Sequence, residues 1–240
     1  MRLRSVARWA SVAAGVGAGA YTTYACLTWL RYGHVSQPTP ESTDALLDRF
    51  MPSYDIAERH HIRVAAPADV TLAAASETNL LGSPIARVIF RAREVIFGSE
   101  PDSAARPGGV LALTTSLGWR VLADVPGHEV VVGAVTRPWE ANVTFHGLPP
   151  DEFAAYNEPG YVKIAWTLRA DPTGPSESVF RTETRAIATD ATARAKFRRY
   201  WSLISPGIIV IRWAMLEPVK REAERRAHRM AEGESCLPSP

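Results

Sequence analysis

A row of short predicted strands that ends in one long helix is the feature that most restricts the fold of this chain. Alternating apolar and polar residues predict strands over residues 119–125, 129–135, 142–145, 161–169 and 178–189. Pro126 and Gly127 separate the first two strands and predict a hairpin. Asp190 then caps a long helix that places Phe197 and Trp201 on one side. Because helices do not alternate with these strands, we expect an α+β fold with an antiparallel sheet rather than a doubly wound parallel sheet.

The chain before these strands adds one more strand and two helices. Ile56, Ile62 and Val64 lie at alternate positions and predict a strand over residues 54–64 with one inner face. Pro67 and Asp69 begin a helix that we expect to reach about residue 76. Residues 83–97 form a second predicted helix, with Ser83 as its N-cap and Pro84 at its first position.

The final helix carries a Pro206-Gly207 pair, which we expect to break or kink it. Its continuation places apolar residues along one side and becomes charged from Lys220 onward. The predicted organisation is a membrane anchor or signal (1–31), a linker (32–53), the main domain (54–205), a C-terminal helical extension (206–232) and a disordered tail (233–240).

The N-terminal segment from Ala10 to Leu30 contains no charged residue. As a helix it just spans a bilayer core of roughly 30 Å. Arg8 and Arg31 flank it, and Trp29 lies near its end, as interfacial aromatic residues do. We therefore expect a single-pass membrane anchor. The basic residues before the span predict a cytoplasmic N-terminus and an extracytoplasmic domain.

Other interpretations of this segment remain open. Arg2 and Arg4 with the small residues that follow also resemble a cleaved signal peptide. Cys26 is a possible lipoprotein site, although the residues before it match such sites poorly. A buried soluble helix is disfavoured because the segment has no polar face.

Composition excludes several classes of function. The 240 residues are 46% hydrophobic, which is enough for a packed core, and Lys+Arg 27 nearly balance Asp+Glu 25. This balance gives no electrostatic basis for nucleic-acid binding. The two cysteines support neither a disulfide framework nor a zinc site, and the scattered histidines predict no metal site. No phosphate-binding glycine loop and no GxSxG motif occurs, so we expect no cofactor.

Two segments resemble the START-like superfamily, which is also known as SRPBCC or Bet v 1-like and includes bacterial polyketide cyclases and lipid-transport proteins. Residues 60–70 (HHIRVAAPADV) resemble the first strand and its turn into the first helix, and residues 178–201 resemble the last strand and the closing helix. The resemblance covers roughly residues 54–204. It implies a helix-grip fold, in which a curved antiparallel sheet wraps around a long C-terminal helix with an apolar cavity between them. It implies no single activity, because the fold hosts carriers, cyclases and structural proteins.

One pair of polar residues is a weak catalytic candidate. Glu58 and His60 alternate with the apolar residues of the first strand, so both side chains are expected to point inward. A histidine and a carboxyl group in an apolar cavity can act as general acid and base. The alternative is that both lie at the rim of the sheet, solvated or paired with each other.

The candidate ligand-binding residues are mostly aromatic. They are Trp119, Trp166, Thr182, Thr184, Phe197, Tyr200, Trp201 and Ile204. Apolar pockets with a few polar groups are typical ligand sites, although the same residues also serve as ordinary core. A basic run in the final helix, Arg194 to Arg199, is either a surface for anionic lipid head groups or a solvated face.

Three functions follow as hypotheses. The first is a membrane-anchored binding or carrier protein whose partner is an apolar small molecule such as a lipid, an isoprenoid or a polyketide-like compound. The second is a cyclase, dehydratase or hydrolase that uses His60 and Glu58. The third is a structural envelope protein whose cavity is filled by its own side chains.

Overall fold

The computed structural model describes residues 2–35, 39–40, 43–79 and 108–235. Side chains are described from residue 15 onward in the first helix and up to residue 232 in the last. The helix predicted over residues 83–97 lies outside the described residues.

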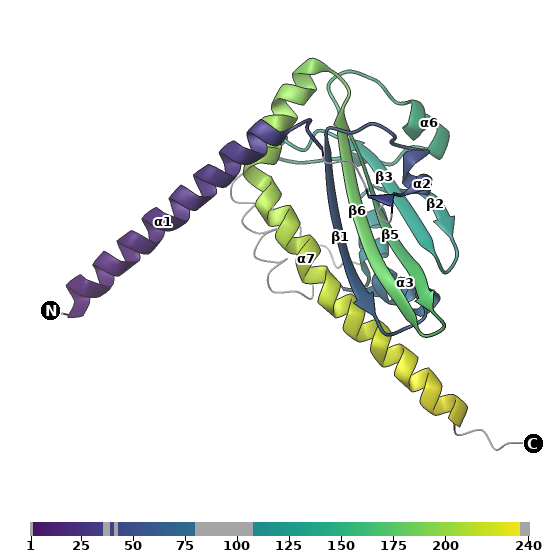
Figure 1. Ribbon diagram of the computed structural model, residues 1–240. Coiled ribbons are helices and arrows are strands. Elements are labelled where there is room, and N and C mark those ends of the chain that lie inside the picture. Colours follow the sequence, from purple (N-terminus) through teal and green to yellow (C-terminus); the bar gives the residue numbers. More distant parts are fainter. Residues whose placement is uncertain (1, 36–38, 41–42, 80–107, 236–240) are drawn as a thin grey trace, which may run out of the picture.

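An antiparallel sheet forms the centre of the molecule (Figure 1). Its strands are β1 (Ile56–Val64), β2 (Arg120–Val125), β3 (Glu129–Thr136), β4 (Phe145–His146), β5 (Val162–Gly174) and β6 (Glu177–Ala188). The order is β1-β6-β5-β3-β2, and the short β4 pairs with β3. The predicted α+β class, with an antiparallel sheet and a long C-terminal helix, is confirmed, and this arrangement fits a helix-grip fold.

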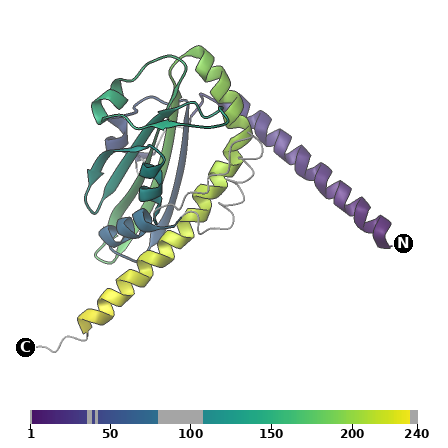
Figure 2. The ribbon, with the colours of Figure 1, turned by 180° about the vertical axis from the view of Figure 1, so that it is seen from behind.

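Three helices cover one face of the sheet, which we call the inner face (Figure 2). They are α3 (Ala68–Glu77), α5 (Val110–Ser116) and α7 (Ala191–Ser235). The apolar core between them joins residues of every layer. It includes Val132, Trp166, Leu168 and Phe180 from the sheet, Leu72 from α3, Val110 from α5, and Met215, Val219 and Ala223 from α7. Burial of this apolar surface is the main stabilisation of the fold.

The opposite face, which we call the outer face, is partly covered by α2 (Ala45–Asp48) and α6 (Pro150–Ala155). Leu47, Met51 and Phe153 pack there against Val131 and Val135 of β3. The alternation in β6 predicts a solvated outer face, but Glu183 and Arg185 are buried. The reason is that residues 43–54, all but the last of them in the predicted linker (32–53), fold across this face and contribute buried side chains.

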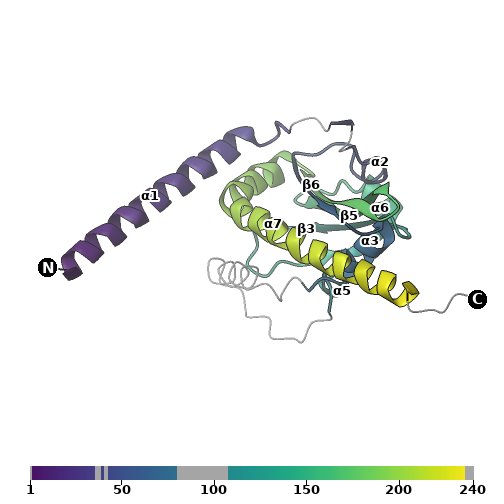
Figure 3. The ribbon, with the colours of Figure 1, turned by 60° about the horizontal axis from the view of Figure 1, so that its bottom comes forward.

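Helix α7 does not end at Pro206. Asp190 caps its first turn, since its carboxylate accepts hydrogen bonds from the amides of Thr192 (2.7 Å) and Ala193 (3.0 Å). The helix then continues through Pro206 and Pro218 and bends along its length (Figure 3). Residues 206–232, predicted as a C-terminal helical extension, contribute Met215, Val219 and Ala223 to the inner-face core.

Helix α1 (Arg2–Arg31) projects away from the domain (Figure 1). Most of its described side chains are exposed. Tyr32, directly after it, is buried and donates a hydrogen bond to the Asp55 carboxylate (3.1 Å). Asp55 also pairs with Arg194 of α7 (2.8 Å), so the end of α1 is fixed to both the sheet and α7.

Among the described residues, one helix is long and apolar enough to cross a membrane, and it is residues 191–232 of α7 rather than the predicted N-terminal segment. A core helix passes the same test of length and composition, and α7 packs against the sheet. The predicted anchor lies partly outside the described side chains, so it stays a prediction.

Candidate functional site

The candidate site is a patch of polar side chains within the apolar inner face. Antiparallel pairing aligns Glu58 with Thr184 and Thr184 with Trp166, while His60 aligns with Thr182. Directly paired residues point to the same face of a sheet. As the alternation in the first strand predicts, Glu58 and His60 lie on the same face as Ile56, which packs against α7.

Arg212 of α7 completes this patch from the opposite side. Its guanidinium donates a hydrogen bond to the Thr182 hydroxyl (3.2 Å) and lies 5.0 Å from the centre of the Trp166 ring. Among the described residues no carboxylate pairs with it. A guanidinium has five N–H donors, so Arg212 retains donors for a further partner.

Two buried polar atoms of the patch have no hydrogen-bond partner among the described residues. They are Nε2 of His60 and Oγ1 of Thr184. Leaving a buried polar atom unpaired costs about 1–3 kcal/mol, so such atoms in a native protein usually have a partner in the functional state. Both lie on the inner face near Arg212, which marks this place for the polar part of a bound molecule.

Burial shifts the acid–base properties of both candidate residues. It raises the pKa of Glu58, and the nearby Arg59 offsets this only in part. It lowers the pKa of His60, and the positive charge of Arg212 and the neighbouring His61 lower it further. His60 is therefore neutral at pH 7, with one ring nitrogen able to accept a proton or a hydrogen bond.

The predicted aromatic residues fall into three places. Phe197 and Trp201 pack with Tyr32 and Ile56 in a cluster near the start of α7, and Tyr200 stacks on Phe197. Trp166 belongs to the polar patch. Trp119 lies against Phe145 (ring centres 4.9 Å apart) and packs against the inner-face core, and Ile204 is half-buried on α7.

The sequence-based prediction of the site did not include Arg212, although this charged residue lies within an apolar stripe of the final helix. Ile208 precedes it by one turn of α7 and Met215 follows by three residues, and both belong to the predicted apolar stripe. A charged residue within such a stripe points toward the core, as Arg212 does.

A small recess of about 40 Å³ lies on the outer face. Its arginines are paired with carboxylates, since Arg59 contacts Glu183 (2.9 Å) and Arg181 contacts Asp171 (2.7 Å). The space holds only a few waters. This recess is lined mainly by a charged network of the fold, together with His60 and Thr182 of the patch. Among the described residues, no cluster of three histidine, cysteine or acidic side chains is placed to hold a metal ion.

No protein-family model and no curated protein sequence matches this chain. Among solved structures, norcoclaurine synthase from Thalictrum flavum is 13% identical, with 69% of this chain and 91% of that chain covered and a TM-score of 0.34. A START superfamily protein from Mycobacterium smegmatis is 11% identical, with 72% and 98% covered and a TM-score of 0.27. Zhui aromatase/cyclase from Streptomyces is 16% identical, with 71% and 94% covered and a TM-score of 0.22.

These similarities are too low to transfer a residue role or an activity to this chain. The helix-grip description rests instead on the order of the sheet and on the place of α7.

The geometry itself limits the chemistry of the site. Apolar walls surround one cation, one neutral imidazole, one carboxyl group and hydroxyl groups. Such a surface suits a mostly apolar molecule with one oxygen-bearing end.

Proposed function

We propose that this protein binds and carries an apolar small molecule, such as a lipid, an isoprenoid or a polyketide-like compound, beside the membrane in which α1 is anchored. The observation that carries this proposal is the polar patch at Arg212 within the apolar inner face. The oxygen-bearing end of the ligand accepts hydrogen bonds from the Arg212 guanidinium and pairs with His60 Nε2 and Thr184 Oγ1. The apolar body of the ligand lies against the inner-face core.

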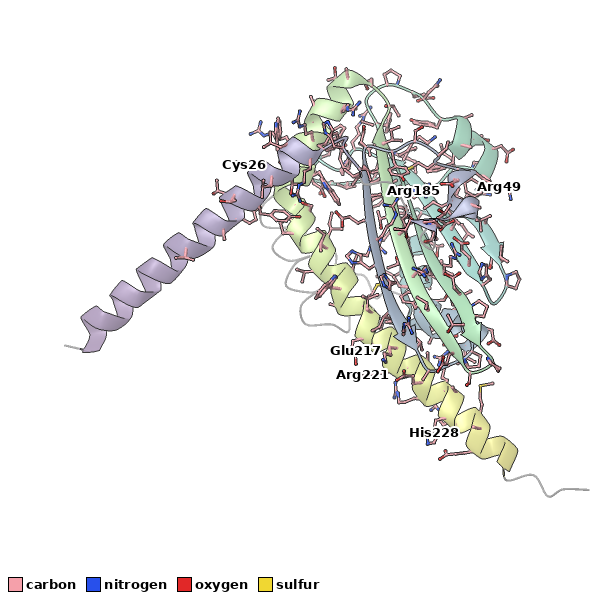
Figure 4. All side chains as sticks on the ribbon, in the orientation of Figure 1. Cys26, Arg49, Arg185, Glu217, Arg221 and His228 are labelled. Atoms are coloured by element: carbon pink, nitrogen blue, oxygen red, sulfur yellow. The ribbon has the colours of Figure 1, made fainter. Side chains whose placement is uncertain are left out.

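A binding titration of the full chain in detergent tests this role of Arg212. The probe is a fluorescent long-chain fatty acid, which combines an apolar body with a carboxylate. Loss of a charge-assisted hydrogen bond costs about 1.5–3 kcal/mol, so Arg212→Met weakens binding by roughly tenfold or more. Arg221→Met is the matched control, because Arg221 lies on the same helix with an exposed side chain and contacts Glu217 instead (Figure 4). Equal affinities of the two variants would contradict the proposed site.

The second candidate function is an enzyme that uses the same patch. Its support is the pair of shifted groups, since burial moves the pKa of Glu58 up and that of His60 down. Whatever apolar molecule co-purifies is the substrate to test. Turnover that is lost in His60→Ala and in Glu58→Gln while binding persists would favour the enzyme over the carrier.

A further inference from the structure

The middle of α7 contains an apolar segment whose outer side faces away from the sheet. Residues 200–211 carry no charged side chain. Leu203, Val210 and Trp213 recur at helical spacing on the side opposite the buried Met215, and Trp213 is 70% exposed. Large apolar side chains exposed together on one helix side mark an interaction surface.

Helix α1 packs against this same segment. The Tyr21 hydroxyl donates a hydrogen bond to the backbone carbonyl of Leu203, and the Tyr24 hydroxyl lies 3.2 Å from that of Ser205. Pro206 has no amide proton, so it leaves the Ser202 carbonyl without its helical partner at this point. The two tyrosines therefore place hydroxyl groups where the backbone hydrogen bonding of α7 is interrupted.

The positions of these contacts along α1 determine how deep the segment lies. Tyr21 precedes Leu30, the end of the predicted span, by nine residues, which is about 14 Å along a helix. Half of a bilayer core is about 15 Å. If α1 spans from Ala10 to Leu30, its partner Leu203 lies below the membrane surface and not in water.

Basic residues lie immediately before this apolar segment, toward the start of α7. Arg194, Lys196, Arg198 and Arg199 directly precede it. Arg198 donates to the backbone carbonyl of Trp29 (2.9 Å) and lies 4.5 Å from the centre of its ring, at the end of the predicted span. Arginine beside an interfacial tryptophan suits the level of the lipid head groups, where each basic residue adds attraction to anionic lipids.

We propose that residues 200–213 of α7 insert into the leaflet beside α1, so that the partner of this apolar surface is the lipid bilayer. The twelve uncharged residues 200–211 are too few to cross a bilayer and suit an interfacial segment. Arg212, which anchors the polar end of the ligand, lies within the last turn of this segment and points toward the sheet. The ligand thereby exchanges between the inner face and the bilayer without passing through bulk water. This inference rests on the proposed carrier function and specifies the route by which the ligand enters and leaves the protein.

Spin labels on single cysteines of the full chain test the insertion. The background carries Cys26→Ser and Cys236→Ser, and the bilayers contain phosphatidylcholine and phosphatidylglycerol in equal parts. Labels are placed through Val210→Cys and Trp213→Cys on the segment, Arg221→Cys beyond it on α7, and Val16→Cys on α1. Since all four native side chains are exposed, the changes leave the packing of the fold intact.

The expected result is that labels at 210, 213 and 16 collide several-fold more with oxygen than with a water-soluble nickel chelate, and that the label at 221 shows the reverse. A lipid-exposed label at 16 with water-exposed labels at 210 and 213 overturns the insertion but leaves the anchor intact. Water exposure at 16 as well overturns the anchor itself. Labels at 210 and 213 shielded from both reagents mean that a second copy of the chain covers the segment, which also overturns the proposal.

Discussion

At the residue scale, the pKa of His60 reports most directly on the site. Burial, Arg212 and His61 lower this pKa, so Arg212→Met removes one of the three causes and raises it. The imidazole carbon signals, followed by NMR across pH, measure the change, and Arg221→Met serves as the control because Arg221 is exposed on the same helix. An unchanged titration of His60 in Arg212→Met would show that the two groups do not share one site.

Arg185 is a fully buried charge that joins β6 to the segment before β1. Its guanidinium pairs with Glu183 (2.7 Å) and Asp48, donates to the Met51 carbonyl (2.8 Å) and lies 4.6 Å from the centre of the Tyr54 ring. Its position on the sheet is visible in Figure 4.

Removal of Arg185 leaves the buried Glu183 with Arg59 as its remaining cation and leaves the buried Met51 carbonyl without this donor. We expect Arg185→Ala to lower the free energy of unfolding by about 3–5 kcal/mol. Arg221→Ala, the exposed control, changes it by less than about 1 kcal/mol. Thermal unfolding in detergent compares the two, and similar melting temperatures would refute the role assigned to Arg185.

Glu129 makes stability depend on pH. Burial and the adjacent Asp44 carboxylate raise its pKa from 4.5 to about 8, while Arg169 lowers it and Asp171 raises it slightly. Between these two pH values the folded chain binds more protons at this group than the unfolded chain does. The free energy of unfolding therefore falls as pH rises from 4.5 to 8, and above that range the contribution is constant.

Glu129→Gln removes this dependence, because an amide stays neutral and still donates to Asp44. We expect the variant to melt at a higher temperature than the wild type at pH 8 and above. The difference in melting temperature between the variant and the wild type becomes smaller as pH falls toward 4.5. Glu217→Gln is the control at an exposed position. Parallel melting curves of Glu129→Gln and the wild type across pH would contradict the raised pKa.

At the element scale, most strands followed from their alternation, but β4 lies at Phe145–His146 rather than over the predicted residues 142–145. The inner-face positions of β1 and β6 could be predicted because one side of each strand is apolar. Pro206 and Gly207 suggested a break or a kink in α7; the helix continues past them, and the core contacts of Met215 and Val219 hold it on the domain beyond the bend. Proline limits one backbone hydrogen bond, whereas burial over several turns decides whether the helix continues.

The residues of the candidate site also divide into those that could be predicted from the sequence and those that could not. Glu58, His60, Thr182 and Thr184 could be placed from strand alternation alone. The apolar stripe of α7 indicates that Arg212 points toward the core, but not which strand residues it meets, since its partners Thr182 and Trp166 are far away in the sequence. The pairing of Glu129 with Asp44 was likewise missed, because it depends on how residues 43–54 cross the outer face.

Helix α7 offers a direct comparison between a core residue and a surface residue. Phe197 is buried among Tyr32, Ile56 and Trp201, whereas Met230 on the same helix is 59% exposed. We expect Phe197→Ala to lower the free energy of unfolding by about 3–5 kcal/mol, because it leaves a cavity in a packed cluster. Met230→Ala changes it by less than about 0.5 kcal/mol. Comparable effects in chemical unfolding would mean that the start of α7 is not packed as described.

At the scale of the whole molecule, the junction between α1 and the domain is fixed and not a loose tether. Tyr32, Asp55 and Arg194 connect the end of α1 to β1 and α7. If α1 is the proposed membrane anchor, this junction holds the inner face in one orientation to the bilayer. A carrier gains from this arrangement, because its ligand dissolves in the membrane and not in water.

Native mass spectrometry of the full chain, released from mild detergent and followed by solvent extraction, tests the central claim that this protein binds an apolar molecule. The account predicts one apolar molecule with an oxygen-bearing end per chain in the wild type and in Arg221→Met, and its loss in Arg212→Met. A wild-type chain that carries no such molecule, and that takes up no fluorescent fatty acid when one is supplied, would contradict the account and favour a structural protein.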